Sequence, residues 1–142
     1  MAGNGGQLQG EKVHAIQQKV NLLLANATDF IRGGISVNGV TGTMKLAGAA
    51  EAPGVDVETH GIGPAQRHTM SAIGNSNYYE MVWVHPDVEC LQMTNEIYAN
   101  YADGLYAVDS DGNVDVPDGP GYGIEYDWKA IDRLTTATKV HD

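Results

Sequence analysis

The chain has 142 residues, a formal net charge of −10 and only eight lysines and arginines together. This length fits a single domain with an apolar core. The acidic balance argues against nucleic acid and anionic membranes as partners, because both reward clustered positive charge. The single cysteine, Cys90, cannot form an internal disulfide, and no apolar run approaches the roughly 20 residues of a membrane helix. We therefore expect a cytoplasmic protein that acts on small molecules or contacts other proteins.

The first part of the chain alternates between helical and strand-like patterns. Residues 1–10 lack the features of a signal peptide and are expected to be a flexible tail. Apolar residues recur at steps of three and four over 11–26, which predicts a helix. Residues 28–32 are short and β-capable and end at a glycine pair, and a second helix is predicted over 40–52, up to a Pro-Gly break.

The alternation continues through the middle of the chain. Residues 55–59 alternate as a strand does, 65–73 are helical, and 78–84 (Y-Y-E-M-V-W-V) form the most strand-like run. The order helix, strand, helix, strand, helix, strand, with short glycine-containing connections, is typical of parallel βα units. Residues 11–84 therefore predict an α/β fold with three parallel strands.

Residues 85–142 have a different character. A hairpin is predicted from 105–109 and 113–116, around a Ser-Asp-Gly turn; the same acidic stretch does not match an EF-hand calcium loop. Residues 113–127 (N-V-D-V-P-D-G-P-G-Y-G-I-E-Y-D) contain three glycines and two prolines, so this segment must turn sharply in a fixed shape. A last helix is predicted near 127–134.

Three ionisable residues stand out on or just after the predicted strands: Asp29, His60 and Glu80. In parallel α/β folds, functional side chains gather at the carboxyl ends of the strands. An imidazole beside a carboxylate is a proton-transfer pair, and a second carboxyl group in a dry site can stay protonated and donate to an oxyanion. The alternatives are a loop histidine satisfied by backbone, a cap or turn aspartate, and a glutamate that faces solvent.

Several motifs together resemble the mandelate racemase/muconate lactonising branch of the enolase superfamily, from about Glu11 to Leu134. D-F-I-R-G-G with G-V-T-G (29–34 and 39–42) resembles the sixth barrel strand and its exit, and V-E-T-H-G (57–61) the seventh. N-Y-Y-E (77–80) resembles the eighth, and V-P-D-G-P-G-Y-G-I-E-Y-D (116–127) the C-terminal signature.

The resemblance implies a fold and a set of site residues. The chain would be the C-terminal part of a (β/α)8 TIM-type barrel, namely its last three parallel strands with helices, plus an irregular hairpin and a tail that wraps back. His60 would remove or deliver a proton α to a carboxylate, Asp29 would orient it, and Glu80 would hydrogen-bond the enediolate. His60 and Glu80 lie 20 positions apart (80 − 60), as the family pattern expects, whereas I-S-V-N (35–38) fits an insertion.

The resemblance also implies an activity, namely Mg²⁺-dependent dehydration of a sugar acid (an aldonate or aldarate), with racemisation or cycloisomerisation as the alternatives. The family's capping domain, lysine-bearing strand and magnesium-binding carboxylates precede the part that this chain resembles, so we expect it not to bind Mg²⁺ alone. Its partners would be a small carboxylate substrate, further copies of the complete enzyme, or an N-terminal half. A different alternative is a catalytically silent fragment that serves only as a structural partner.

Overall fold

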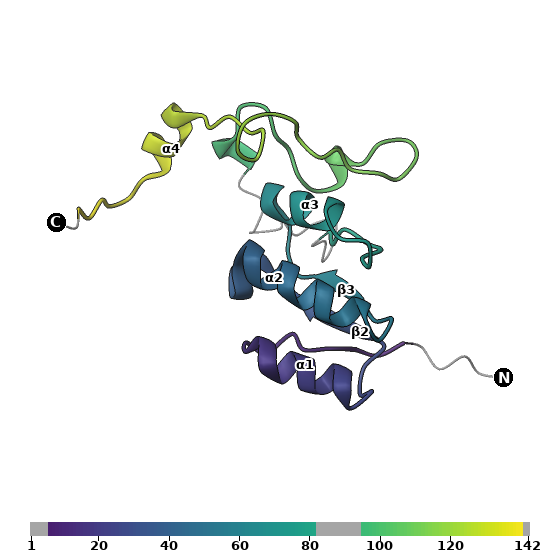
Figure 1. The fold of residues 1–142 in the computed structure, drawn as a ribbon. Helices are drawn as coiled ribbons and strands as arrows, with labels where there is room; N and C mark the ends of the chain where they lie inside the picture. Colours follow the sequence, from purple (N-terminus) through teal and green to yellow (C-terminus); the bar gives the residue numbers. More distant parts are fainter. Residues whose placement is uncertain (1–5, 82–94, 141–142) are drawn as a thin grey trace. The chain divides into compact units, whose positions relative to one another are not determined.

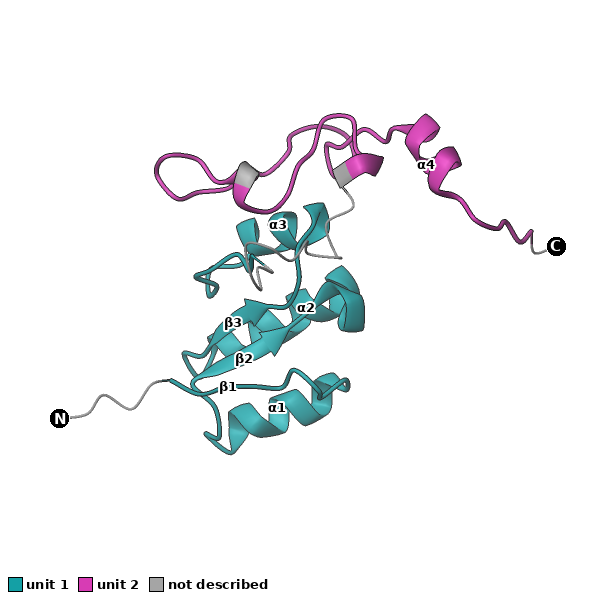
Figure 2. Cartoon of the chain, turned by 180° about the vertical axis from the view of Figure 1, so that it is seen from behind, with its two compact units in different colours: residues 1–82 teal, residues 83–142 magenta. Residues whose placement is uncertain are grey.

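The computed structural model describes residues 6–81 and 95–140. The chain separates into two compact units, residues 1–82 and 83–142, which Figure 2 colours separately.

Unit 1 contains a three-stranded parallel sheet in the order β1-β2-β3; Figure 1 labels β2 and β3, and Figure 2 labels all three strands. The strands are β1 (Leu8–Gln9), β2 (Phe30–Gly33) and β3 (Asp56–Thr59). Residues Phe30 and Gly33 of β2 lie opposite Asp56 and Thr59 of β3. The expected α/β class with three parallel strands is therefore confirmed, and two of the predicted strands are found within one or two residues of their expected bounds.

The third strand of the sheet is not the predicted one. β1 lies in the segment expected to be a flexible tail, whereas residues 78–81 form no strand and 82–84 lie outside the described residues. The segment after α3 approaches β3 through one backbone bond, from the Val57 N–H to the Asn75 carbonyl (2.7 Å). Beyond it, the Tyr78 N–H points to the Glu58 carboxylate instead of a strand. In this segment, hydrogen bonds to side chains thus take the place of the backbone pairing that its aromatic and β-branched residues favour.

The helices of unit 1 are α1 (Ile16–Leu24), α2 (Ile35–Glu51) and α3 (Pro64–Ser71). α1 begins five residues later than predicted (16 − 11), after a turn in which the Val13 N–H donates to the Gly10 carbonyl. α2 begins earlier than predicted and contains a kink at Gly39, whose φ of 62° lies in the left-handed region. The inserted I-S-V-N sequence therefore forms a helical turn before the kink.

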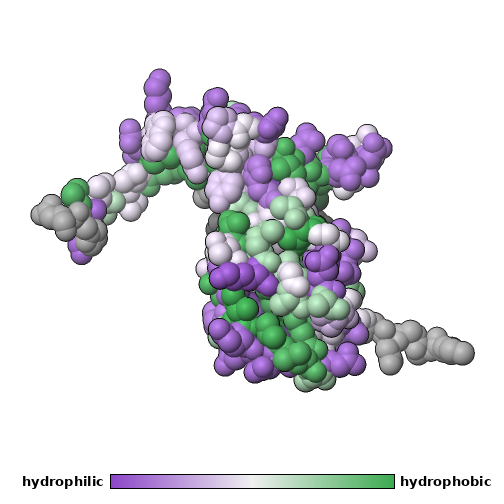
Figure 3. All heavy atoms as spheres, in the orientation of Figure 1, coloured by the Kyte–Doolittle hydropathy of each residue, from purple (hydrophilic) through white to green (hydrophobic). Residues whose placement is uncertain are grey.

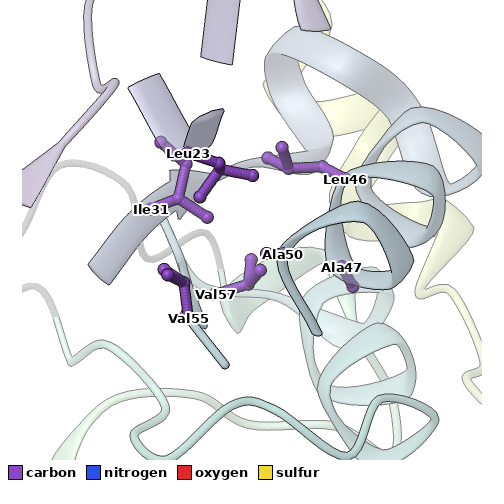
Figure 4. Close-up of a cluster of buried hydrophobic side chains, with 7 residues drawn as sticks. All are labelled: Leu23, Ile31, Leu46, Ala47, Ala50, Val55 and Val57. Carbon is purple, nitrogen blue, oxygen red and sulfur yellow. The ribbon is translucent and has the colours of Figure 1, made fainter. Parts of the chain in front are cut away.

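The core lies between the sheet and the helices on one of its faces. Ile31 and Val57 are fully buried there with Leu46 of α2. Successive strand side chains point to opposite faces, so the residues that flank Ile31 and Val57 face away from this core. Figure 4 shows the cluster, which consists of Leu23, Ile31, Leu46, Ala47, Ala50, Val55 and Val57.

Some apolar side chains of unit 1 remain on its surface over α1 and α2 (Figure 3). The large ones on these helices are Leu24, Val37, Val40 and Met44.

None of the helices in the described residues has the length and apolar character that crossing a membrane requires.

Unit 2 contains short elements joined by irregular chain. They are η1 (Asn95–Ile97), η2 (Leu105–Ala107) and α4 (Trp128–Leu134). The predicted hairpin is reduced to one antiparallel bridge between Val108 and Val114. The Asp109 carboxylate accepts from the backbone N–H groups of Asp111 and Asn113, and these bonds hold the turn.

The glycine- and proline-rich segment has the fixed, sharply turning path that its composition predicts. Gly119, Gly121 and Gly123 all have positive φ values. A Cβ atom on Gly123 would lie 2.8 Å from the carbonyl carbon of Asp118, so the chain folds back on itself more closely than any side chain permits. The following helix α4 is capped by the Asp127 carboxylate, which accepts from the N–H groups of Lys129 and Ala130.

Candidate active site

His60 lies at the carboxyl end of the sheet in unit 1. It directly follows β3, and its N–H donates to the Gly33 carbonyl (2.8 Å), which extends the pairing of β2 and β3 by one residue. The following Gly61 has a φ of 92° and begins the turn into α3. The His60 side chain is 41% exposed, so its imidazole is tethered through the backbone yet accessible.

Glu80 contacts this imidazole. Its Oε2 lies 3.0 Å from His60 Nδ1 and also accepts from the Gly61 N–H, while its Oε1 accepts from Arg32 Nη2 at 2.6 Å. Burial by itself raises the pKa of the Glu80 carboxyl, but the Gly61 N–H and the Arg32 guanidinium outweigh it, so the net pKa is lowered. Glu80 is therefore an ionised hydrogen-bond acceptor near neutral pH. The structure brings His60 and Glu80 together.

Arg32 is the site residue that the sequence reasoning missed. Its Nη2 atom lies 2.6 Å from Glu80 Oε1 and 3.2 Å from His60 Nδ1, and its side chain is only 13% exposed. Arg32 alternates with the buried Ile31 along β2, so it faces away from the apolar core. A cation at an alternate position of an otherwise apolar strand is the signal that could have identified it.

A second cation supports Arg32 through its backbone. Lys19 of α1 is 2% exposed, and its ammonium donates to the Arg32 carbonyl at 2.6 Å and to Asn38 Oδ1 at 3.4 Å. Desolvation by burial lowers the pKa of Lys19. The helical spacing placed Lys19 between Ile16 and Leu23, on the apolar stripe, which is the sequence sign of a buried lysine.

Asp29 lies at the other end of β2. Its carboxylate accepts from the Gln7 N–H at 2.7 Å and thereby ties β1 to the start of β2. The strand register places Asp29 opposite residue 55, five residues before His60 (60 − 55), which corresponds to about 16 Å along the strands. The structure therefore does not bring Asp29 to the imidazole.

The described residues do not form a metal centre. Within 6–81 and 95–140, no three His, Cys, Asp or Glu side chains are grouped so that they could hold an ion. Mg²⁺ requires octahedral oxygen ligands, with at least one or two carboxylates. In this site Glu80 supplies one carboxylate, and both of its oxygens are already held by Arg32 and Gly61. Both carboxylate oxygens of Glu80 therefore serve hydrogen bonds in this site.

The family model for enolase C-terminal domain-like proteins matches residues 8–130. The chain therefore belongs to this family. The resemblance to the mandelate racemase/muconate lactonising branch is confirmed, and His60, Glu80 and Arg32 all lie inside the matched range. Among curated proteins no match is found.

Solved structures of larger proteins share the fold. D-glucarate dehydratase from Agrobacterium tumefaciens, complexed with magnesium, is 29% identical, with a TM-score of 0.71 over 89% of this chain and 32% of its own. A racemase from Streptomyces coelicolor with bound magnesium is 24% identical, with a TM-score of 0.69 over 89% and 31%. An enolase from Bradyrhizobium, complexed with magnesium and mandelic acid, is 21% identical, with a TM-score of 0.66 over 89% and 31%.

The chain thus spans about a third of the length of these proteins. Its fold is that of the C-terminal part of the barrel, and its relatives include a dehydratase and a racemase.

Proposed function

We propose that the chain is the proton-transfer segment of a Mg²⁺-dependent enzyme that dehydrates a sugar acid, an aldonate or aldarate, with His60 as the catalytic base. The observation that carries this proposal is the contact between His60 Nδ1 and the Glu80 carboxylate, at the carboxyl end of the sheet. The similarity to D-glucarate dehydratase supports dehydration over racemisation or cycloisomerisation, which belong to the same superfamily. We also propose a cytoplasmic location, because the single cysteine of this chain cannot form an internal disulfide.

The reaction begins with removal of the proton α to the substrate carboxylate. His60 Nε2 takes this proton, and the electron pair of the broken C–H bond moves into the carboxylate to form an enediolate. The β-hydroxyl then leaves, and the proton held on His60 is available to convert it to water. Racemisation would instead return a proton to the α carbon from the opposite face.

The supporting roles differ from those that the family resemblance implies. An ionised Glu80, with a lowered pKa, accepts hydrogen bonds and does not donate one to an enediolate oxygen. Because Asp29 is bound at the other end of β2, we assign the orientation of His60 to Glu80 instead. Magnesium, with ligands from outside the described residues, remains part of the proposal for the complete enzyme and provides charge stabilisation when bound.

A catalytically silent structural partner is the second candidate. The observation that favours it is that both carboxylate oxygens of Glu80, the acid beside His60 in the described residues, are already held by Arg32 and the Gly61 N–H. A preorganised, water-excluding site is needed to stabilise an enediolate. Without the rest of the barrel, the chain would then contribute packing alone to a larger assembly.

The test is an activity assay on acid sugars with Mg²⁺. The 142-residue chain is assayed alone and after co-expression with a family N-terminal segment that carries the capping domain and the rest of the barrel. We expect no turnover by the chain alone, and turnover by the mixture that is lost in His60→Ala. His14→Ala is the matched control, since His14 is exposed and precedes α1.

The outcomes separate the two candidates. Turnover that survives His60→Ala would overturn the assignment of the base. A stable complex with no turnover on any acid sugar would establish the silent partner instead. Turnover by the chain alone, abolished by His60→Ala, would show that the chain needs no N-terminal half.

A further inference from the structure

We propose that Arg32 is a positioning residue: it holds Glu80 so that the carboxylate accepts the Nδ1 proton of His60 and leaves Nε2 free to exchange a proton with substrate. The part about substrate rests on the proposed function, whereas the tautomer of His60 does not. The contacts among Arg32, Glu80 and His60 decide which tautomer is present.

The Nδ1 atom of His60 faces two groups. Glu80 Oε2 lies 3.0 Å from it and can only accept, whereas Arg32 Nη2 lies 3.2 Å from it and can only donate. Arg32 Nη2 carries two protons: one is directed to Glu80 Oε1 at 2.6 Å, and the other faces Nδ1 in a contact whose donor depends on the tautomer. A lone pair on Nδ1 would face an ionised oxygen at the shorter of the two distances. We assign the proton to Nδ1, because the ionised Glu80 oxygen is nearer to it than the Arg32 nitrogen is and can accept a charge-assisted bond.

Arg32, Glu80 and His60 differ in how far their side chains are exposed. The exposed fraction of the side chain rises from 13% at Arg32 to 25% at Glu80 and 41% at His60. Arg32 is therefore the most buried of the three side chains, and the His60 imidazole is the most exposed. Because Nδ1 is occupied by Glu80, Nε2 is the ring nitrogen that remains for an incoming molecule.

The Glu80 carboxylate depends on Arg32 for its orientation. Glu80 lies in a segment that forms no helix or strand, so no backbone ladder fixes it. Its two oxygens are held separately, Oε1 by Arg32 and Oε2 by the Gly61 N–H. Arg32 is itself fixed by β2 and by the bond from Lys19 to its carbonyl. Loss of the guanidinium therefore releases one of the two constraints on the carboxylate that sets the tautomer.

The test reads the tautomer directly in the 142-residue chain. Histidine is labelled with ¹⁵N, and the two ring nitrogens of His60 are distinguished by their ¹⁵N shifts at mildly alkaline pH; the signals are assigned by their loss in His60→Ala. In the wild type we expect Nδ1–H with an unprotonated Nε2. In Arg32→Gln we expect the ratio of Nδ1–H to Nε2–H to fall about tenfold, the scale of one charge-assisted hydrogen bond. Arg32→Lys, which keeps a charged donor, should recover most of the ratio.

The control is Arg133→Gln, because Arg133 also pairs with a glutamate, Glu96, but at 3.5 Å and with a side chain that is 69% exposed. It should leave the His60 signals unchanged. Nε2–H as the main form of the wild type would overturn the proposal without any variant. An unchanged ratio in a folded Arg32→Gln protein would also overturn it. If Arg32→Gln does not fold, Glu80→Gln decides, since it should lower the ratio as well.

Activity in the co-expressed mixture separates this inference from the function on which it partly rests. If turnover is present, we expect Arg32→Gln to lower kcat with little change in KM, because Arg32 does not reach the substrate in the proposed reaction. A tautomer set by Arg32 without any turnover would refute the proposed function alone. Turnover that depends on His60 but not on Arg32 would refute the positioning role alone.

Discussion

Glu80→Gln tests how much the Arg32–Glu80–Gly61 contacts stabilise unit 1. Gln has the shape of Glu but no charge, and one of its two terminal atoms is a donor. If the amide oxygen of the substituted side chain accepts from Arg32, the amide NH₂ group faces the Gly61 N–H, which is also a donor. In the reverse orientation, the NH₂ group faces the Arg32 guanidinium, which is likewise a donor. The variant thus loses one hydrogen bond outright and weakens the other from a charged to a neutral one.

The magnitude follows from these two changes. A hydrogen bond to a charged group contributes about 1.5–3 kcal/mol and a neutral one about 0.5–1.5 kcal/mol. Losing one and weakening the other gives roughly 3 kcal/mol for a fully buried group. The Glu80 side chain is 25% exposed, and solvent screening reduces the expected loss to about 2 kcal/mol at neutral pH.

The pH dependence gives the sharper test. The folded pKa of Glu80 lies below its ordinary value of 4.5, so the unfolded chain binds more protons between the two values. The stabilisation by Glu80 is therefore complete above pH 4.5 and is lost as the pH falls through the folded pKa. The difference between wild type and Glu80→Gln should shrink over the same window, because a protonated Glu80 resembles Gln.

Urea unfolding followed by far-ultraviolet circular dichroism measures this difference, since α1, α2 and α3 all belong to unit 1. Glu96→Gln is the control: its partner Arg133 is 3.5 Å away and both side chains are more than two-thirds exposed, so a loss below about 0.5 kcal/mol is expected. A difference for Glu80→Gln that stays equal from neutral to acid pH would refute the role of the carboxylate charge.

Three further changes have expected outcomes. The wild-type free energy of unfolding should rise with pH between the lowered pKa of Lys19 and 10.5, because only the unfolded chain binds the proton there, and Lys19→Met should abolish this rise in urea titrations. Gly123→Ala should destabilise unit 2 by at least about 1 kcal/mol more than Gly121→Ala in thermal unfolding, since both have positive φ but only the Gly123 Cβ would meet the Asp118 backbone. Leu46→Ala, at a fully buried position, should cost about 2–5 kcal/mol in urea unfolding, and a smaller loss would contradict the packing.

Local patterns predicted the parallel fold because they depend on features of neighbouring residues. The Pro-Gly break after residue 52 and the spacing of apolar side chains place α2 and β3 within a few residues. Asp127, with its carboxylate before an apolar helix, likewise marks the start of α4. The strand at Leu8–Gln9 could not be predicted this way, since two residues carry no periodicity and their pairing with β2 is a long-range contact.

The sequence predicted which site residues follow a strand, but not the contacts between residues that are far apart in the chain. His60 follows a strand, so its position at the strand's carboxyl end was readable. The contact of Glu80 with Arg32 joins residues 48 positions apart and depends on a segment without regular structure. Asp29 was predicted to lie on the strand, and it lies one residue before the start of β2. Its distance from His60 depends on whether it is at the beginning or the end of the strand, and residue propensities locate strand boundaries poorly.

The bond from Lys19 to the Arg32 carbonyl limits where this chain can be recombined with its relatives. The loop between α1 and β2 looks like a natural crossover point, because it lies outside both elements. A crossover there would separate the ammonium from the carbonyl that it holds, and a new α1 without a lysine at this position would remove this partly buried bond. The smallest block that can be exchanged with the site and its supports intact therefore begins at β1 and ends after Glu80.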